Sequence, residues 1–141
     1  MIRILAVAIA LGALCPVFPG SEARADERQL HSYINGRHIL ISRRDGGAVY
    51  GTYFFFHTHY CASGRYVVYA SSVKQSVLGG EQRQQWEVRG NWRVMTQGGQ
   101  EGIFYRDTDG GTEFLPMRIR QDGSAYIRDG VNVAPQGRAQ C

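Results

Sequence analysis

Two histidines, His57 and His59, are separated by a single residue in a run of strand-forming residues. Alternate side chains of a strand point to the same face, so both imidazoles would face one side. That spacing is used by zinc and copper ligands. A third ligand would have to come from His31, His38 or an acidic residue, and no second motif requires one. The pair therefore predicts either a metal site or two ordinary histidines at a strand end.

Two cysteines follow residue 25, namely Cys61 in the middle of the chain and Cys141 at its last position. In an oxidising compartment such cysteines pair, either within the chain or between two chains. An intramolecular bond would close a loop of roughly 80 residues, worth about 4.5 kcal/mol in the chain-entropy view. We expect this disulfide to hold the C-terminus against the domain.

Other chemical motifs are weak. The segment 107–113, Asp-Thr-Asp-Gly-Gly-Thr-Glu, resembles a calcium loop, but its glycines come too early and a hairpin turn fits better. The sequence contains no Gly-x-Ser-x-Gly, no His-Glu-x-x-His, no phosphate loop and no dinucleotide fingerprint. We therefore expect a protein without enzymatic activity and without a cofactor. A site of Tyr, His and Arg in a barrel mouth stays open as an alternative.

The N-terminal residues have the pattern of a secretory leader. Arg3 precedes an apolar run over 4–14, which is shorter than the roughly 20 residues of a membrane-spanning helix. An Ala-Arg-Ala cleavage signal ends at residue 25. We expect a signal peptide at 1–25, a single domain at 26–141, and a periplasmic or secreted location. The residues around Cys15 do not fit a lipoprotein signal, so it would leave with the leader.

The charge of the chain is mildly basic. The 16 basic residues, of which Lys74 is the sole lysine, exceed the 12 acidic ones by four. Such a small excess does not indicate a nucleic-acid partner. Arginine in place of lysine suits a phosphate or carboxylate surface, but codon usage in a GC-rich genome is the better explanation.

Beyond residue 29 the sequence alternates between apolar and polar residues with a period of two, and no helical stripe stands out. Gly, Asn and Asp clusters separate the runs, as in hairpins. We expect eight strands, at 37–42, 48–60, 65–71, 82–89, 92–97, 100–106, 112–121 and 124–128.

One turn fixes the register of two predicted strands. A two-residue turn at 98–99 sets Val94 opposite Ile103. It also sets Trp92 opposite Tyr105, so that four apolar side chains share one face of the sheet.

The other turns are less regular. A three-residue loop at 89–91 is needed to keep Val88 on the apolar face. A two-residue turn at 122–123 leaves Ile127 pointing away from that face, and a bulge would correct this. Pro116 inside a strand indicates a sheet edge or a bulge.

These strands predict an all-β fold. Short turns between antiparallel strands favour a small up-and-down barrel of about eight strands, with a β-sandwich as the alternative. The run 53–56, Tyr-Phe-Phe-Phe, is apolar on both faces of its strand. One face would fill the core, and the other would be covered by 26–35, by the C-terminal tail, or by a ligand or partner.

The patterns Trp-x-Val-x-Gly-x-Trp-x-Val at 86–94 and Gly-x-Tyr-Phe at 51–54 belong to a layout over 37–133. This layout resembles the small lipocalin-like barrels found among bacterial periplasmic proteins. The resemblance implies an eight-stranded barrel with a ligand cavity. It assigns no functional residue.

We therefore expect an exported, non-enzymatic binding module for a small apolar or amphipathic ligand. The inward residues that would line its cavity are Tyr66, Val68, Trp86, Trp92 and Tyr105. A protein-interaction domain, such as an inhibitor or an envelope accessory factor, is the first alternative. Metal binding through the histidine pair is the second.

Overall fold

A computed structural model describes residues 20–47 and 50–141, with side chains from residue 26. The predicted leader therefore lies almost wholly outside the described residues, and cleavage after residue 25 stays a prediction. The chain forms one helix followed by strands in this order: α1 (Gly20–Ile34), β1 (Arg37–Gly46), β2 (Gly51–Tyr60), β3 (Arg65–Gln75), β4 (Glu81–Gln97), β5 (Gln100–Asp107), β6 (Thr112–Pro116), β7 (Arg118–Ile119), β8 (Ala125–Tyr126) and β9 (Val131–Arg138).

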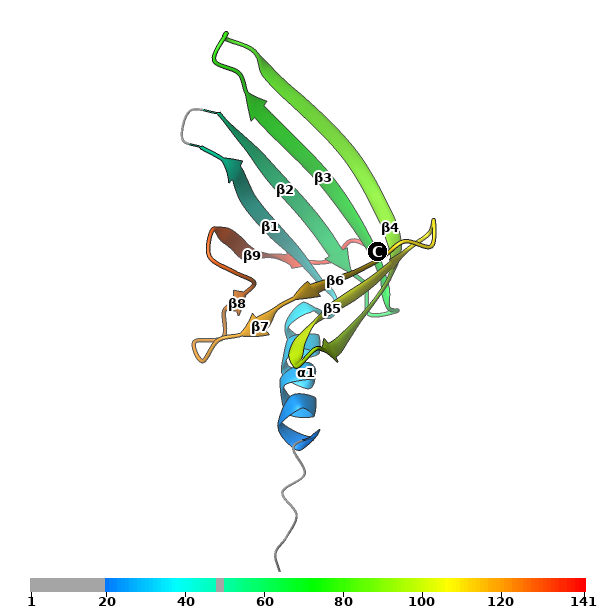
Figure 1. Ribbon diagram of the computed structural model, residues 1–141. Coiled ribbons are helices and arrows are strands. Elements are labelled where there is room, and N and C mark those ends of the chain that lie inside the picture. The colour runs from blue at the N-terminus through cyan, green and yellow to red at the C-terminus, as the bar shows by residue number, and fades with distance from the viewer. Residues whose placement is uncertain (1–19, 48–49) are drawn as a thin grey trace, which may run out of the picture.

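The strands form a curved antiparallel sheet in the order β6-β5-β4-β3-β2-β1-β9, with β7 and β8 as a separate hairpin (Figure 1). The predicted mostly β, antiparallel fold is confirmed. Within the described part of the chain, β6 and β9 are not paired with each other. The predicted closed barrel is therefore not found, and the sheet has a concave and a convex face with open edges.

Strand β4 is longer than predicted. It runs without interruption through the segment 89–91, where we expected a loop. Its first part pairs with β3 and its last part with β5, and Gly90 belongs to both ladders. A Cβ atom at Gly90 would lie 2.0 Å from the carbonyl oxygen of Arg106. The predicted loop is therefore wrong. Gly90 does not turn the chain; its lack of a side chain allows β5 to approach β4 closely.

The other turns follow the sequence more closely. The turn at 98–99 gives the expected register, with Trp92 opposite Tyr105. The turn near 122–123 is one residue longer than predicted, since the N–H of Arg120 donates to the carbonyl of Ser124. Strand β6 lies on the edge of the sheet, as Pro116 predicted, but the predicted strand 112–121 is divided at this proline into β6 and β7.

Helix α1 was not predicted, and it closes one end of the core. Leu30 and Ile34 stand four residues apart on one helical face and are fully buried. The helix ends before Gly36, whose φ of 71° is the left-handed conformation of a C-terminal cap. It packs on β1, β4, β5 and β7. No helix in the described ranges is long and apolar enough to cross a bilayer.

The aromatic run of β2 is covered differently from the expectation. The guanidinium of Arg43 lies 5.0 Å from the ring centre of Phe54 and 5.8 Å from that of Phe56, on one face. On the other face, that of Arg44 lies 5.1 Å from the ring centre of Tyr53. Neighbouring arginines of β1 cover these rings, and α1 packs elsewhere.

Candidate functional site on the concave face

The concave face of the sheet holds a cavity of about 750 Å³. Its walls come from β1 to β6 and from the segment before β9. The apolar part of the wall is formed mainly by Phe56, Val68, Trp86, Val88, Leu115 and Val131. A volume of this size accommodates a small organic molecule.

Strand register explains why these side chains meet. Phe56 stands opposite Ala70, which in turn stands opposite Trp86 on the next strand. Ala70 is buried and small, so the rings of Phe56 and Trp86 reach across it and meet edge to face at 6.3 Å. Trp86 remains 39% exposed. This part of the wall is therefore aromatic and open to solvent.

Tyr66 and Tyr105 line the cavity, and the fully buried Tyr60 lies behind Tyr105. The hydroxyls of Tyr60 and Tyr105 lie 2.5 Å apart, and the ring of Tyr66 packs edge-on against Tyr105 at 5.1 Å. Burial raises the pKa of Tyr60 and of Tyr105 well above the ordinary value. Burial, with Asp107 and Glu113 nearby, also raises the pKa of Tyr66. All three phenols are neutral at physiological pH and can act as hydrogen-bond donors.

Charged side chains of both signs also line the cavity. Arg43 and Arg128 contribute guanidinium groups, whereas Asp107 and Glu113 contribute carboxylates. The Nε atom of Arg43 lies 3.4 Å from a carboxylate oxygen of Asp45. In this arrangement Arg43 offers its charge beside the aromatic wall. The cavity can therefore bind a molecule that has both an apolar body and a polar head.

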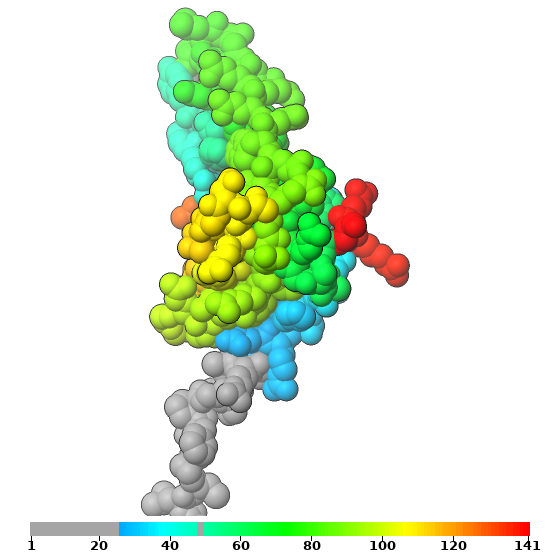
Figure 2. Space-filling view, turned by 90° about the vertical axis from the view of Figure 1, so that its right-hand side faces the viewer, coloured from blue at the N-terminus to red at the C-terminus, as the bar shows by residue number. Residues whose placement is uncertain are grey.

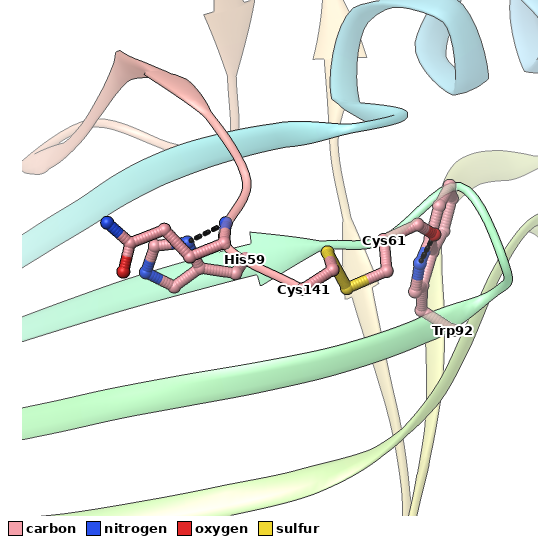
Figure 3. The surroundings of a disulfide bond; sticks show 5 residues. His59, Cys61, Trp92 and Cys141 are labelled. Atoms are coloured by element: carbon pink, nitrogen blue, oxygen red, sulfur yellow. Dashed lines mark hydrogen bonds between the residues drawn. A yellow bond between two sulfur atoms is a disulfide. The ribbon is translucent and has the colours of Figure 1, made fainter.

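Of the five residues that the sequence predicts in the cavity wall, four line this cavity, namely Tyr66, Val68, Trp86 and Tyr105. Trp92 does not, because it lies in the packed core with 6% of its surface exposed. Its indole N–H donates to the carbonyl of Cys61 at 3.1 Å (Figure 3). Trp92 therefore supports the fold below the cavity, and binding of a ligand by the other four stays a prediction.

Two wall residues that matter for the chemistry, Arg43 and Phe56, were not assigned to a cavity from the sequence. Their signal was present in the alternation of β1 and β2, because Arg43 continues the inward series of Ile39 and Ile41. When the neighbouring strands are not known, an arginine at the end of that series is assigned to a solvent-exposed face.

The histidine pair lies on the opposite, convex face. His57 and His59 share that face, and β1 brings His38 between them. The His38 Nε2 and His57 Nδ1 atoms are 3.0 Å apart, and the rings of His38 and His59 stack at 4.1 Å. His31 instead stacks on the indole of the core tryptophan. Metal binding stays a prediction: across 26–47 and 50–141, no group of three or more metal-ligating side chains has suitable geometry.

The C-terminal tail is fixed beside these histidines. Cys61 and Cys141 form the predicted disulfide, with their Cα atoms 6.0 Å apart (Figure 3). The backbone N–H of Gln140 donates to Nδ1 of His59 at 3.0 Å. Figure 2 shows the tail, in red, against this side of the molecule. The bond joins the chain end to the β2–β3 turn, away from the cavity.

The acidic segment 107–113 forms the turn between β5 and β6. A carboxylate oxygen of Asp107 accepts the backbone N–H groups of Asp109 and Gly111 at 3.0 and 2.7 Å. These bonds hold a hairpin turn, which is the structure favoured by the sequence.

Comparison of the whole chain with protein-family models, with curated proteins and with solved structures found no match. The cavity itself is therefore the main indication of function.

Proposed function

We propose that this protein is an exported, non-enzymatic binding protein for a small amphipathic molecule, held on the concave face of the sheet. The observation that carries the proposal is the cavity of about 750 Å³ with an aromatic and aliphatic wall. Ligand sites of small molecules are generally concave, mostly apolar, and equipped with a few polar groups. The resemblance to small lipocalin-like barrels is part of this proposal, although those barrels enclose a ligand within a closed sheet and this sheet is open.

The apolar body of the ligand would lie against Phe56, Trp86 and Val88. Side chains of this kind gain roughly 25 cal/mol for each Å² of apolar surface removed from water. An alkyl chain or a flat ring fits a wall built from two aromatic rings and aliphatic groups. The partly exposed Trp86 is the residue that such a ligand would cover most directly.

The polar head would be anionic. Arg43 carries its charge beside the aromatic wall, and Arg128 lines the same cavity. A guanidinium group binds a carboxylate through two parallel hydrogen bonds. Asp107 and Glu113 disfavour an anion near the tyrosines, so the head would lie toward the arginines.

Binding is better supported than turnover. Burial raises the pKa values of Tyr66 and Tyr105 in the cavity wall, so both phenols stay protonated near neutral pH and supply no phenolate as a base or nucleophile. The convex-face histidines lie on the opposite side of the sheet. The cavity thus offers recognition groups without an activated nucleophile.

Calorimetric titration of the purified, oxidised protein with decanoate tests the proposal. We expect saturable binding at one site, and we expect Trp86→Ala to weaken it by about tenfold, the loss of roughly 1.4 kcal/mol of contact. Tyr69→Ala is the matched control, because Tyr69 is also an exposed aromatic residue on the same sheet but faces the convex side.

A second titration, with decanol, distinguishes the contribution of the alkyl chain from that of the carboxylate, which decanol lacks. Arg43→Gln should weaken binding of decanoate and leave that of decanol unchanged. Absence of saturable binding for both molecules, or equal losses in Trp86→Ala and Tyr69→Ala, would contradict the proposed site.

A further inference from the structure

The first half of β4 has one edge without a neighbouring strand. The β5 ladder begins only at Gly90, whereas β4 begins at Glu81 and is paired with β3 from its first residue. Figure 2 shows the β3–β4 hairpin rising above the β5–β6 turn, with β4 toward the viewer. Unpaired strand edges are sites of association with another strand. The segment 81–88 is such an edge, and it ends before Arg89, whose carbonyl accepts the backbone N–H of Thr108.

The backbone polarity of this edge can be read from one hydrogen bond. The carbonyl oxygen of Arg89 accepts the N–H of Thr108, so it points away from β3. Backbone groups alternate along a strand, and those of Glu87, Gln85 and Arg83 therefore point to the open side as well. Side chains at these odd positions stand on the convex face of the sheet.

The charges along the edge are complementary to themselves. On the convex face the odd positions 81–89 read Glu, Arg, Gln, Glu, Arg. Reversing the direction of the strand turns each acidic position into a basic one about Gln85. An antiparallel copy would set Arg83 opposite Glu87 on each side of the axis, with the two Gln85 residues facing each other on it. Arg89 takes no part in this pairing, because Thr108 already lies opposite it.

Within one chain these charges form ion pairs along the strand. Arg83 contacts Glu81 at 2.9 Å, and Arg89 contacts Glu87. The Arg83 side chain is 70% exposed, so it remains accessible to a partner. An edge with charges of a single sign would repel a second copy, whereas alternating acidic and basic side chains attract one.

The other open edges are less suited to pairing. Strand β9 contains Pro135, which lacks an N–H group, and β6 ends at Pro116 after five residues. The segment 81–89 contains neither proline nor glycine.

We propose that two copies of this chain associate through the edge 83–87 of β4, antiparallel about a two-fold axis at Gln85, to form one continuous sheet. On the concave side, Gln84 of one copy would stand opposite Trp86 of the other. The two cavities would then face the same side of the dimer. This inference is independent of the ligand proposal, because it depends on the backbone edge and the convex charges.

Sedimentation equilibrium tests the dimer. We expect the wild-type protein to dimerise. Arg83→Glu should raise the dimer dissociation constant by about tenfold or more, because the new glutamate would face Glu87 of the other copy, and the two-fold axis makes this repulsive contact occur twice. The double variant Arg83→Glu, Glu87→Arg restores opposite charges and should restore the dimer. Arg106→Glu is the control, since Arg106 is exposed on β5 away from the edge.

A cross-link locates the interface. Residues on a two-fold axis that form a hydrogen-bonded antiparallel pair have Cα atoms about 5.5 Å apart, which a disulfide can span. Gln85→Cys should therefore give a disulfide-linked dimer under mild oxidation, whereas Gln97→Cys at the β4–β5 turn should not. A wild-type monomer at about 100 μM, a dimer unaffected by Arg83→Glu, or equal cross-linking by both cysteine variants would overturn the proposal.

Discussion

At the scale of single residues, the strand register decides the environment of each functional side chain. Neighbouring positions of β3 illustrate this, since Val67 faces the convex side and Val68 the cavity. The same alternation separates the buried tyrosines from the histidines of β2. One side of the sheet is consequently suited to binding an apolar molecule, and the other carries a cluster of histidines.

The histidines of the convex face should make stability depend on pH. Burial and the nearby imidazoles lower the pKa of His38, and burial with His57 lowers that of His59. In the unfolded chain both would return to about 6.5. Between the lowered and the ordinary values the unfolded chain binds more protons. The free energy of unfolding should therefore fall as the pH decreases below about 6.5.

Urea unfolding at pH values from about 5 to 8 measures this slope. His59→Gln keeps a hydrogen-bond acceptor for the backbone N–H of Gln140 but does not titrate, so its slope should be shallower. Equal slopes for the wild type and His59→Gln would show that His59 does not contribute.

At the scale of elements, the sequence predicted most strands because alternate residues of a half-buried sheet differ in polarity. The prediction failed where one residue type can serve two structural roles. Gly90 was read as part of a turn, whereas it serves a close approach between strands. Helix α1 was missed because its buried stripe consists of little more than Leu30 and Ile34 in an otherwise polar segment.

The same reasoning applies to the candidate site. Alternation correctly assigned Tyr66, Trp86 and Tyr105 to the cavity side. It also assigned Trp92 there, because alternation gives the face of a residue but not its depth. Depth depends on α1, whose His31 stacks on the indole, and this contact has no signal in the strand pattern.

Gly90 should tolerate no side chain. A methyl group there would meet the Arg106 carbonyl oxygen, so Gly90→Ala should force β4 and β5 apart and cost about 1–3 kcal/mol of unfolding free energy. Gly80→Ala is the control, since a Cβ atom at Gly80 meets nothing within 4 Å and its φ is ordinary. Denaturant unfolding of both variants compares the costs, and similar values would refute the close-approach explanation.

At the scale of the whole molecule, the disulfide and the helix close the parts of the domain that the open sheet leaves exposed. Helix α1 covers the lower end of the core in Figure 1, and the Cys61–Cys141 bond fixes the chain end outside the convex face. Neither enters the cavity wall. The domain can therefore keep its concave face free for a ligand.

Removal of the disulfide should lower stability more than it changes binding. Replacing Cys61 and Cys141 by serine frees a loop of 80 residues and should cost up to about 4.5 kcal/mol of unfolding free energy. Gln140→Ala, with the bond intact, should be close to neutral because its backbone N–H remains. Thermal and urea unfolding give both values. A loss below about 1 kcal/mol in the double variant would show that the tail is held by other contacts.

The central claim is that an amphipathic molecule binds on the concave face, and a methyl NMR titration with decanoate tests it most directly. We predict saturable shifts for the methyl groups of Val68, Val88 and Leu115 in the cavity wall. Val67 and Val73 lie on the opposite face of β3 and should not respond. Absence of shifts at the cavity methyl groups, or equal shifts on both faces of β3, would contradict the account.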